Sequence, residues 1–264
     1  MFTGDYNFFE YKYNIQGYSG QDYGGLAQWL YLGLSIALIA LLLYLMRNTP
    51  REKVKKILAY AGVFMTLFYI GKTAWESVYD IRRDGAFNVG ILPLDSCSIV
   101  MPALLLAGFG RGKPAHLAEC WLASGGILGG FGTMLFLNAF KYYPFFSFGA
   151  FYSMLWHFLM VFLGLLTVVT GSLELSPAVP LKGFLFHLAI SAVVIPLDFI
   201  FKWDFMMYRE MSSIPIFNDV GAKLLSQGRE ALNPPIMLAV YFAAFFVIYA
   251  LLCLGKLLHR CVHR

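Results

Sequence analysis

Long apolar segments recur along the chain and alternate with short polar ones. Each is long enough to cross the hydrocarbon core of a bilayer, which takes about 20 residues of α-helix. The pattern predicts an all-α, polytopic membrane helix bundle of about seven transmembrane helices. The expected helices are Leu26–Met46, Ile57–Tyr79, Ile91–Phe109, His116–Phe140, Gly149–Thr170, Gly183–Lys202 and Ile236–Leu258.

Basic residues at the ends of these segments predict a topology. Lys and Arg are enriched on the cytoplasmic side of membrane proteins. The densest basic cluster follows the first helix and comprises Arg47, Arg51, Lys53, Lys55 and Lys56. We therefore expect the N-terminus outside and the C-terminus in the cytoplasm, in agreement with an odd number of helices.

This topology divides the chain into three parts. Residues 1–25 form a polar, tyrosine-rich extracytoplasmic segment, without the basic start of a cleavable signal peptide. Residues 26–258 form the transmembrane domain, and residues 259–264 form a basic cytoplasmic tail. We expect a multi-pass protein of the cell membrane.

The composition argues against a soluble domain, a nucleic-acid-binding protein and a zinc-binding protein. Hydrophobic residues make up 59% of the chain and charged residues only 13%, against about 25% charged in soluble domains. The net charge of +5 comes from residues at helix ends, so it does not indicate nucleic-acid binding. The four cysteines show no CxxC pair and no Cys/His zinc spacing. We expect no metal and no soluble cofactor.

Glycines gather in the fourth predicted helix. Gly125, Gly126, Gly129, Gly130 and Gly132 form overlapping GxxxG pairs, which let another helix approach closely. The partner helix is either in the same bundle or in a second copy of the chain. A homodimer through the Gly125–Gly132 face is therefore one possible use of this surface.

Ionisable and nucleophilic residues inside apolar helices are costly, and they are candidates for function. A helix rises about 1.5 Å per residue, and on this arithmetic one group falls in a single layer of the outer half. This layer comprises Lys72, Glu76, Asp95, Cys97, His157 and Asp198. Lys72 and Glu76 are four residues apart, so they face each other as an ion pair or orient a lipid headgroup. His187 and Glu119 lie outside the layer, and we interpret His187 as structural or interfacial.

Cys97 and His157 are the candidates for nucleophile and base. Pro93 suits the first turn of a helix, and a thiol near a helix N-terminus gains thiolate character. Ser153, one turn before His157, leaves room around the imidazole. The alternative interpretation is a buried, inert cysteine and a histidine that hydrogen-bonds a backbone carbonyl.

Two short strings, Leu92–Cys97 (LPLDSC) and Ser153–Phe158 (SMLWHF), carry a resemblance. Together with Asp198–Tyr208 (DFIFKWDFMMY), they resemble the YwaF-like bacterial membrane proteins and their eukaryotic relatives, the transmembrane protein 164 family. The resemblance implies an intramembrane acyltransferase in which Cys97 and His157 move a fatty acyl chain onto a lysophospholipid. Trp203-Asp204-Phe205 stands where relatives often carry an Asn-Tyr pair.

Two classes of function remain open. In the first, His157 takes the thiol proton, Cys97 attacks an acyl ester, and the acyl-enzyme passes its chain to a lysophospholipid, or to water in a hydrolase. Lys72 or the backbone N–H groups of the third helix would stabilise the oxyanion. Glu76 or Asp198 would orient His157. Asp95 completes the site. In the second class, a small-solute transporter or binding protein uses the same polar layer, and a purely structural protein is a weaker third interpretation.

Overall fold

The computed structural model describes residues 6–16, 18, 20, 24–86, 89–136, 139–211 and 215–262. The long elements are α1 (Leu26–Met46), α2 (Arg51–Asp84), α7 (Phe148–Val169), α8 (Ala178–Phe201) and α10 (Asn233–Val262). Shorter helices complete the chain, and they are α3 (Val100–Phe109), α4 (Gly112–Trp121), α5 (Ile127–Leu135), α6 (Ala139–Tyr142) and α9 (Pro215–Ser226). A π-helical segment lies at Leu122–Gly126, and short 3₁₀ turns lie at Val89–Ile91, Ser96–Ile99, Phe205–Met207 and Glu230–Leu232.

Among the described residues, six helical stretches are long and apolar enough to cross a membrane. They are Leu26–Met46, Arg51–Asp84, Gly112–Tyr142, Phe148–Val169, Ala178–Phe201 and Glu230–Leu258. A seventh apolar stretch, Ser96–Phe109, is shorter. The prediction of an all-α polytopic bundle is thus confirmed, whereas the orientation of its termini stays a prediction.

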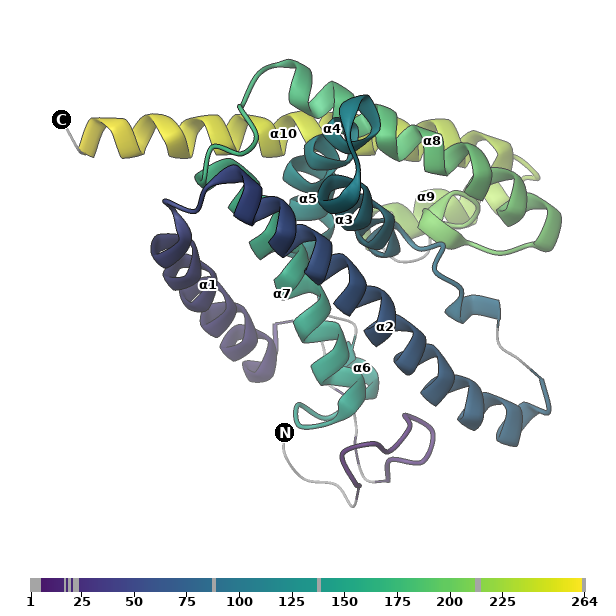
Figure 1. The fold of residues 1–264 in the computed structure, drawn as a ribbon. Helices are drawn as coiled ribbons and strands as arrows, with labels where there is room; N and C mark the ends of the chain where they lie inside the picture. The colour runs from purple at the N-terminus through teal and green to yellow at the C-terminus, as the bar shows by residue number, and fades with distance from the viewer. Residues whose placement is uncertain are drawn as a thin grey trace.

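The helices form two groups that cross each other. In Figure 1, α1, α2 and α7 run diagonally, and α8 and α10 lie across their upper ends. The short helices α3, α4 and α5 lie between the groups, because α3 packs on α2, α5 on α7 and α4 on α8. This central position places the start of the Ser96–Phe109 helix among α2, α5 and α7.

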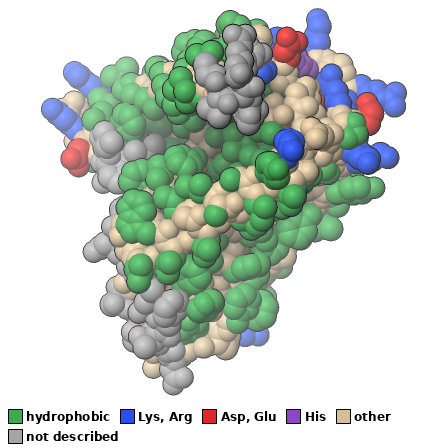
Figure 2. Space-filling view, turned by 90° about the vertical axis from the view of Figure 1, so that its left-hand side faces the viewer, with side chains coloured by type: hydrophobic (Ala, Val, Ile, Leu, Met, Phe, Trp, Pro, Cys, Tyr) green, Lys and Arg blue, Asp and Glu red, His purple; other side chains and the backbone are tan. Residues whose placement is uncertain are grey.

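Hydrophobic side chains cover much of the outside of the bundle. On α1 alone, Trp29, Leu34, Leu41 and Leu45 are exposed. In Figure 2, hydrophobic side chains cover most of the middle and lower face, and Lys and Arg gather mainly near the upper edges. Such a surface suits contact with lipid tails, so the described helices have the exterior of a membrane protein.

The third predicted helix begins later than expected. The sequence predicts Ile91–Phe109, but helical structure starts at Ser96 with a 3₁₀ turn that leads into α3. Pro93 disfavours helical backbone at the residue before it, and Asp95 is extended, with φ −68° and ψ 153°. Asp95 therefore ends a connecting segment instead of lying inside a helix, and Cys97 is the second residue of the helix.

The second helix is longer than predicted at both ends. The sequence predicts Ile57–Tyr79, whereas α2 spans Arg51–Asp84. Pro50 suits the position before the first turn, and Gly85 ends the helix in the left-handed conformation, with φ 69°. The basic residues from Arg51 to Lys56 therefore belong to the first turns of α2 and not to a loop.

The fourth predicted helix contains a π-helical segment, Leu122–Gly126. Its glycines are used inside the chain. A Cβ atom on Gly125 would lie 2.7 Å from the Phe245 ring, and one on Gly130 would lie 2.9 Å from Met160 Cβ. Gly132 has nothing within 4 Å of the corresponding position. The close approach predicted from the GxxxG pairs thus takes place within the bundle, and a homodimer stays a prediction.

The described part of the N-terminal segment packs on the last turns of α2 and the first turn of α7. The Tyr11 side chain is buried, and its hydroxyl donates to Asp80 Oδ1 at 3.2 Å. Burial, and then the nearby Glu76 and Asp80 carboxylates, raise the pKa of Tyr11, so the hydroxyl keeps the proton that it donates. The Trp75 indole also donates to the carbonyl of Phe9 at 3.0 Å. These contacts place residues 6–16 against the helix ends nearest the candidate site.

Candidate functional site

Cys97 lies in the first turn of the Ser96–Phe109 helix and is half-buried. Its sulfur is 3.9 Å from the hydroxyl oxygen of Thr133 on α5. A Cβ atom placed on Gly129 would also lie 3.9 Å from this sulfur, so the glycine leaves space beside the thiol. The first N–H groups of a helix have no intrahelical acceptor. The thiol therefore belongs to the turn of the helix where such donors are expected, at a half-buried position.

His157 lies on α7 and is buried, with 8% of its surface exposed. Its Nδ1 atom is 2.7 Å from the carbonyl oxygen of Ser153. A carbonyl oxygen only accepts, so Nδ1 carries the proton, and in the neutral imidazole Nε2 is then the proton acceptor. The group that orients His157 is therefore Ser153 of its own helix, as the alternative interpretation from sequence had it.

One hydrogen bond connects the two candidate residues through a neighbour. The Trp156 indole Nε1 donates to the carbonyl oxygen of Cys97 at 3.3 Å. This bond holds the Cys97 turn against α7, one residue away from His157. Among the described residues, no hydrogen bond joins the Cys97 thiol to the imidazole itself, whose Nδ1 is held by Ser153. Catalytic hydrogen bonds are often long in apo structures and tighten when substrate binds.

Lys72 and Glu76 form the ion pair that their spacing predicts. Lys72 Nζ contacts Glu76 Oε2, and both side chains are largely buried. The Lys72 ammonium also lies 5.5 Å from the centre of the Tyr152 ring on α7. Lys72 interacts electrostatically with Asp95, so three of the predicted site residues lie in one neighbourhood. Glu76 is engaged by Lys72 and does not hydrogen-bond His157.

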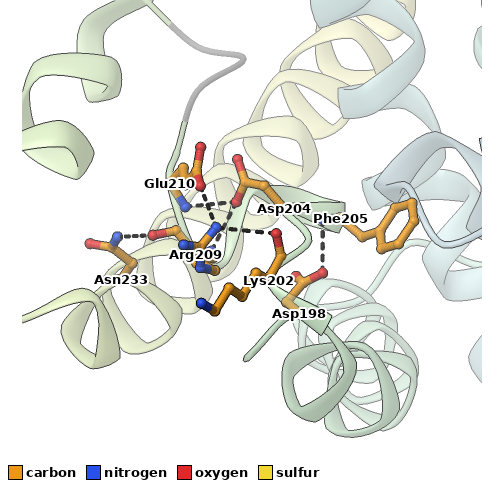
Figure 3. Close-up of polar contacts among 7 residues, drawn as sticks. All are labelled: Asp198, Lys202, Asp204, Phe205, Arg209, Glu210 and Asn233. Atoms are coloured by element: carbon orange, nitrogen blue, oxygen red, sulfur yellow. Dashed lines mark hydrogen bonds and ion pairs between the residues drawn. The ribbon is translucent and has the colours of Figure 1, made fainter. Parts of the chain in front are cut away.

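Asp198 and Asp204 stabilise the backbone that follows α8, as Figure 3 shows. Asp198 is fully buried, and its Oδ1 accepts the Phe205 N–H at 2.9 Å. Asp204 Oδ1 accepts the N–H groups of Arg209 at 2.9 Å and Glu210 at 2.7 Å. Asp198 thus fixes the turn after α8 instead of orienting His157.

The same turn meets Asp95 at a small cavity of about 200 Å³. Two of the predicted site residues, Asp95 and Asp198, also interact electrostatically with each other and with Asp204. The cavity is lined by Gly90, Asp95, Trp203, Asp204 and Phe205. The structure therefore brings Asp95 and Asp198 into the neighbourhood of Cys97, which follows Asp95 by two residues.

Sequence reasoning missed the partners of Cys97. Thr133 lies one turn after Gly129 on α5, and only that spacing connects it to the glycine-rich face. Trp156 appears in the string next to His157, but its contact with Cys97 joins residues 59 positions apart. Neither contact leaves a local pattern in the sequence.

The sequence also did not reveal the partners of His187, which is the centre of a second polar group on α8. The Trp121 indole donates to His187 Nδ1 at 3.4 Å, so Nε2 carries the proton and donates to the Tyr208 oxygen at 3.2 Å. The Tyr208 hydroxyl donates to Ser191 Oγ at 2.5 Å, and Ser191 donates to the His187 carbonyl at 2.8 Å. Burial raises the pKa of Tyr208 to about 12, so this hydroxyl keeps its proton. Every donor of these side chains is used.

A second Cys–His contact lies near the opposite ends of the helices. Cys120 Sγ is 3.8 Å from His116 Nε2. The Lys182 ammonium, which only donates, lies 3.1 Å from the same nitrogen. Cys120 is fully buried. Its thiol is closed to substrate, and the nitrogen that would take its proton already accepts from Lys182.

The described residues contain no group of three or more His, Cys, Asp or Glu side chains that could hold a metal ion. The candidate site consists of a half-buried thiol, a buried imidazole and the first backbone N–H groups of the Ser96–Phe109 helix. The fold and this arrangement define a multi-pass α-helical membrane protein with a thiol at a helix start.

Comparison with known families gives the particular class. The model of the TMEM164 family matches residues 23–257, so the chain belongs to the TMEM164 family. The match includes every candidate residue of the site. Neither a curated protein nor a solved structure gives a significant match.

Proposed function

We propose that this protein is a lipid acyltransferase of the cell membrane that uses Cys97 as nucleophile and His157 as general base. The observation that carries the proposal is the hydrogen bond from the Trp156 indole to the Cys97 carbonyl. It holds the backbone of Cys97, which carries a half-buried thiol, against α7 at the residue that precedes His157. The proton acceptor of that histidine would be Nε2, because Nδ1 is held by the Ser153 carbonyl. The substrates would be a phospholipid donor and a lysophospholipid acceptor, as the resemblance to the family implies.

The reaction would run in two transfers. His157 Nε2 takes the thiol proton, and the thiolate attacks the ester carbonyl carbon of the phospholipid. The ester C–O bond breaks, the leaving alkoxide takes the proton from the imidazolium, and a thioester forms on Cys97. In the second transfer, His157 deprotonates the acceptor hydroxyl, whose oxygen attacks the thioester. The C–S bond breaks, the new ester is released, and the thiol regains its proton.

Backbone N–H groups are the better candidates for oxyanion stabilisation. The N–H groups of Ser96 and Cys97 belong to the first turn of the helix, where intrahelical acceptors are missing. Preorganised donors of this kind stabilise the charge that develops on the carbonyl oxygen. Lys72 is already held by Glu76, so it would act at longer range, on a lipid headgroup or on the site's charge balance.

A labelled phospholipid tests the proposal. Purified protein is incubated with phosphatidylcholine that carries an alkyne fatty acid, and the adduct is detected before and after neutral hydroxylamine, which cleaves thioesters. We expect a hydroxylamine-sensitive adduct on Cys97. Cys97→Ala should abolish it, and Cys97→Ser should leave either no adduct or one that resists hydroxylamine, as an oxygen ester does.

The chain offers a matched control. A variant that keeps Cys97 alone (Cys120→Ala, Cys253→Ala, Cys261→Ala) should form the adduct at the wild-type level. An adduct that survives Cys97→Ala, or that is lost in the variant with Cys97 alone, would contradict the proposal. No adduct under any condition, together with saturable binding of a small solute, would favour the transporter interpretation.

The identity of the acyl acceptor distinguishes a transferase from a hydrolase. If lysophospholipid increases the turnover of the adduct and appears as labelled product, the protein is a transferase. If the adduct decays to free fatty acid at the same rate without lysophospholipid, water is the acceptor and the protein is a hydrolase.

A further inference from the structure

The far end of α3 borders a second cavity, of about 300 Å³. It lies between the first turns of α2 and the connection from α3 to α4. Its walls include Lys55 and Lys56 from α2 and Arg111 from the connection. Gly108 of this cavity is eleven residues after Cys97 in the sequence, roughly 17 Å along the helix axis. The cavity is therefore separate from the candidate acyl-transfer site.

At this cavity, α2 and α3 approach closely through small residues. A Cβ atom on Gly108 would lie 2.5 Å from Ala59 Cα, so no side chain fits between the two helices there. Gly108 and Ala59 both line the cavity. The lining thus combines these small residues with longer basic side chains.

The charge of the cavity is strongly positive. Lys55, Lys56 and Arg111 face one carboxylate, Glu52, in its lining. None of the three cations forms an ion pair with a described residue. By contrast, the adjacent Arg51 is paired with Glu119 at 3.6 Å. The cavity thus gathers cations that the protein leaves uncompensated next to one that it neutralises.

Aromatic side chains lie beside these cations on the outside of the bundle. Tyr60, one turn after Lys56 on α2, is 72% exposed, and Phe109 is 62% exposed. Both also line the cavity. Aromatic rings of this kind concentrate at the level of lipid headgroups. The opening of the cavity therefore combines cations with rings that suit the border between headgroups and acyl chains.

We propose that this cavity binds the headgroup phosphate of an anionic phospholipid, with the lipid's glycerol and upper acyl chains against Tyr60 and Phe109. Basic cavities between transmembrane helices on the cytoplasmic side bind anionic headgroups in this way. The cations come from the end of the bundle that carries the densest Lys and Arg cluster. The lipid is held as a ligand, since the candidate nucleophile lies at the other end of the Ser96–Phe109 helix.

Native mass spectrometry of the delipidated full-length protein tests the proposal, with phosphatidylglycerol as probe and phosphatidylcholine as the zwitterionic comparison. The pocket variant carries Lys55→Gln, Lys56→Gln and Arg111→Gln. The control variant carries Arg47→Gln, Lys53→Gln and Lys113→Gln. It loses the same charge through exposed residues near the same ends of the helices that do not line the cavity.

We expect wild-type protein to bind phosphatidylglycerol more tightly than phosphatidylcholine. A cation near an anionic headgroup contributes about fivefold in affinity, so the pocket variant should lose about 100-fold. The control variant should keep the wild-type affinity within about fivefold. Equal losses in both variants would overturn the proposal, because diffuse surface charge would then explain the binding.

Two further arms complete the test. Inorganic phosphate at the lipid's concentration should not displace phosphatidylglycerol, and displacement would show a site for free anions instead of a lipid. Where the pocket variant fails to fold by circular dichroism, the variant Lys55→Arg, Lys56→Arg retains the charges and should bind phosphatidylglycerol as the wild type does. If that folded variant no longer binds phosphatidylglycerol more tightly than phosphatidylcholine, the result would also contradict the proposal.

Discussion

The two buried histidines of the described bundle have opposite surroundings. Both ring nitrogens of His187 are engaged, one by the Trp121 indole and one by the Tyr208 hydroxyl. At His157, one nitrogen is held by a carbonyl of its own helix. No hydrogen bond to its other nitrogen forms among the described residues. His187 is thus fully hydrogen-bonded, whereas His157 keeps one ring nitrogen without a hydrogen bond among the described residues.

This difference separates structure from chemistry. In the His187 group, the direction of every hydrogen bond is fixed, because the Trp121 indole only donates and the His187 carbonyl only accepts. Any change leaves a buried group unpaired, which costs about 1–3 kcal/mol. Around Cys97, the sulfur has one weak contact with Thr133, and one nitrogen of His157 makes no hydrogen bond among the described residues. We expect changes in the His187 group to lower stability, and changes of Cys97 or His157 to lower activity.

The largest expected effect on stability concerns the buried ion pair of Lys72 and Glu76, near the candidate site. Lys72→Met leaves a buried carboxylate without its cation and should lower the free energy of unfolding by about 3–5 kcal/mol. The double change Lys72→Met, Glu76→Leu removes both charges and should recover most of the loss. Unfolding in mixed micelles, followed by circular dichroism, measures both. Equal losses in the two variants would show that the pair is not coupled.

The next effect compares the histidines directly. His187→Leu leaves the Trp121 indole and the Tyr208 hydroxyl short of a partner, so the free energy of unfolding should fall by about 3 kcal/mol. His157→Leu breaks only the bond to the Ser153 carbonyl and should cost about 1 kcal/mol. Both are measured by the same unfolding titration. A larger loss at His157 than at His187 would reverse the comparison.

A smaller effect isolates one bond of the His187 group. Tyr208→Phe removes the hydroxyl between His187 and Ser191 and should lower the free energy of unfolding by about 1–2 kcal/mol. Tyr60→Phe makes the same change at an exposed position, and its effect should stay within about 0.5 kcal/mol. Thermal unfolding of both variants in the same detergent gives the difference. If the two tyrosines behave alike, the His187 group does not contribute to stability.

The smallest expected effect is the change in the free energy of unfolding caused by replacing Cys97. The sulfur has only the weak Thr133 contact at 3.9 Å. Cys97→Ala should therefore change the free energy of unfolding by less than about 1 kcal/mol. Thermal unfolding measured alongside wild-type protein checks this. A loss as large as that of His187→Leu would mean that Cys97 is a core residue, in conflict with a reactive role.

Much of the fold could be predicted from hydropathy, because each long apolar segment needs a helix to satisfy its backbone in a membrane. The helix predicted at Gly149–Thr170 is found one residue earlier, at Phe148–Val169. The late start of the third helix followed from Pro93 and an extended Asp95, features that local periodicity does not resolve. The π-helical segment depends on tertiary packing of glycines, which apolar content alone does not indicate.

The site could be predicted in part. The spacing of Lys72 and Glu76 gave their ion pair, since residues four apart share one helix face. Depth along the helices placed Asp95 near Lys72 but could not reveal that Asp198 binds the Phe205 N–H. Contacts such as Trp156 with Cys97 join distant segments, and they depend on how the helices pack. Roles for Cys97 and His157 stay proposals.

The rate of acyl transfer tests the central claim most directly. Equal amounts of folded wild-type protein and variants are given a labelled phospholipid and a lysophospholipid, and labelled product is followed with time. Cys97→Ala and His157→Gln should each fall to the background rate, and the double variant should be no slower, because residues that act as a unit are not additive. Transfer at the wild-type rate by folded Cys97→Ala would contradict the account.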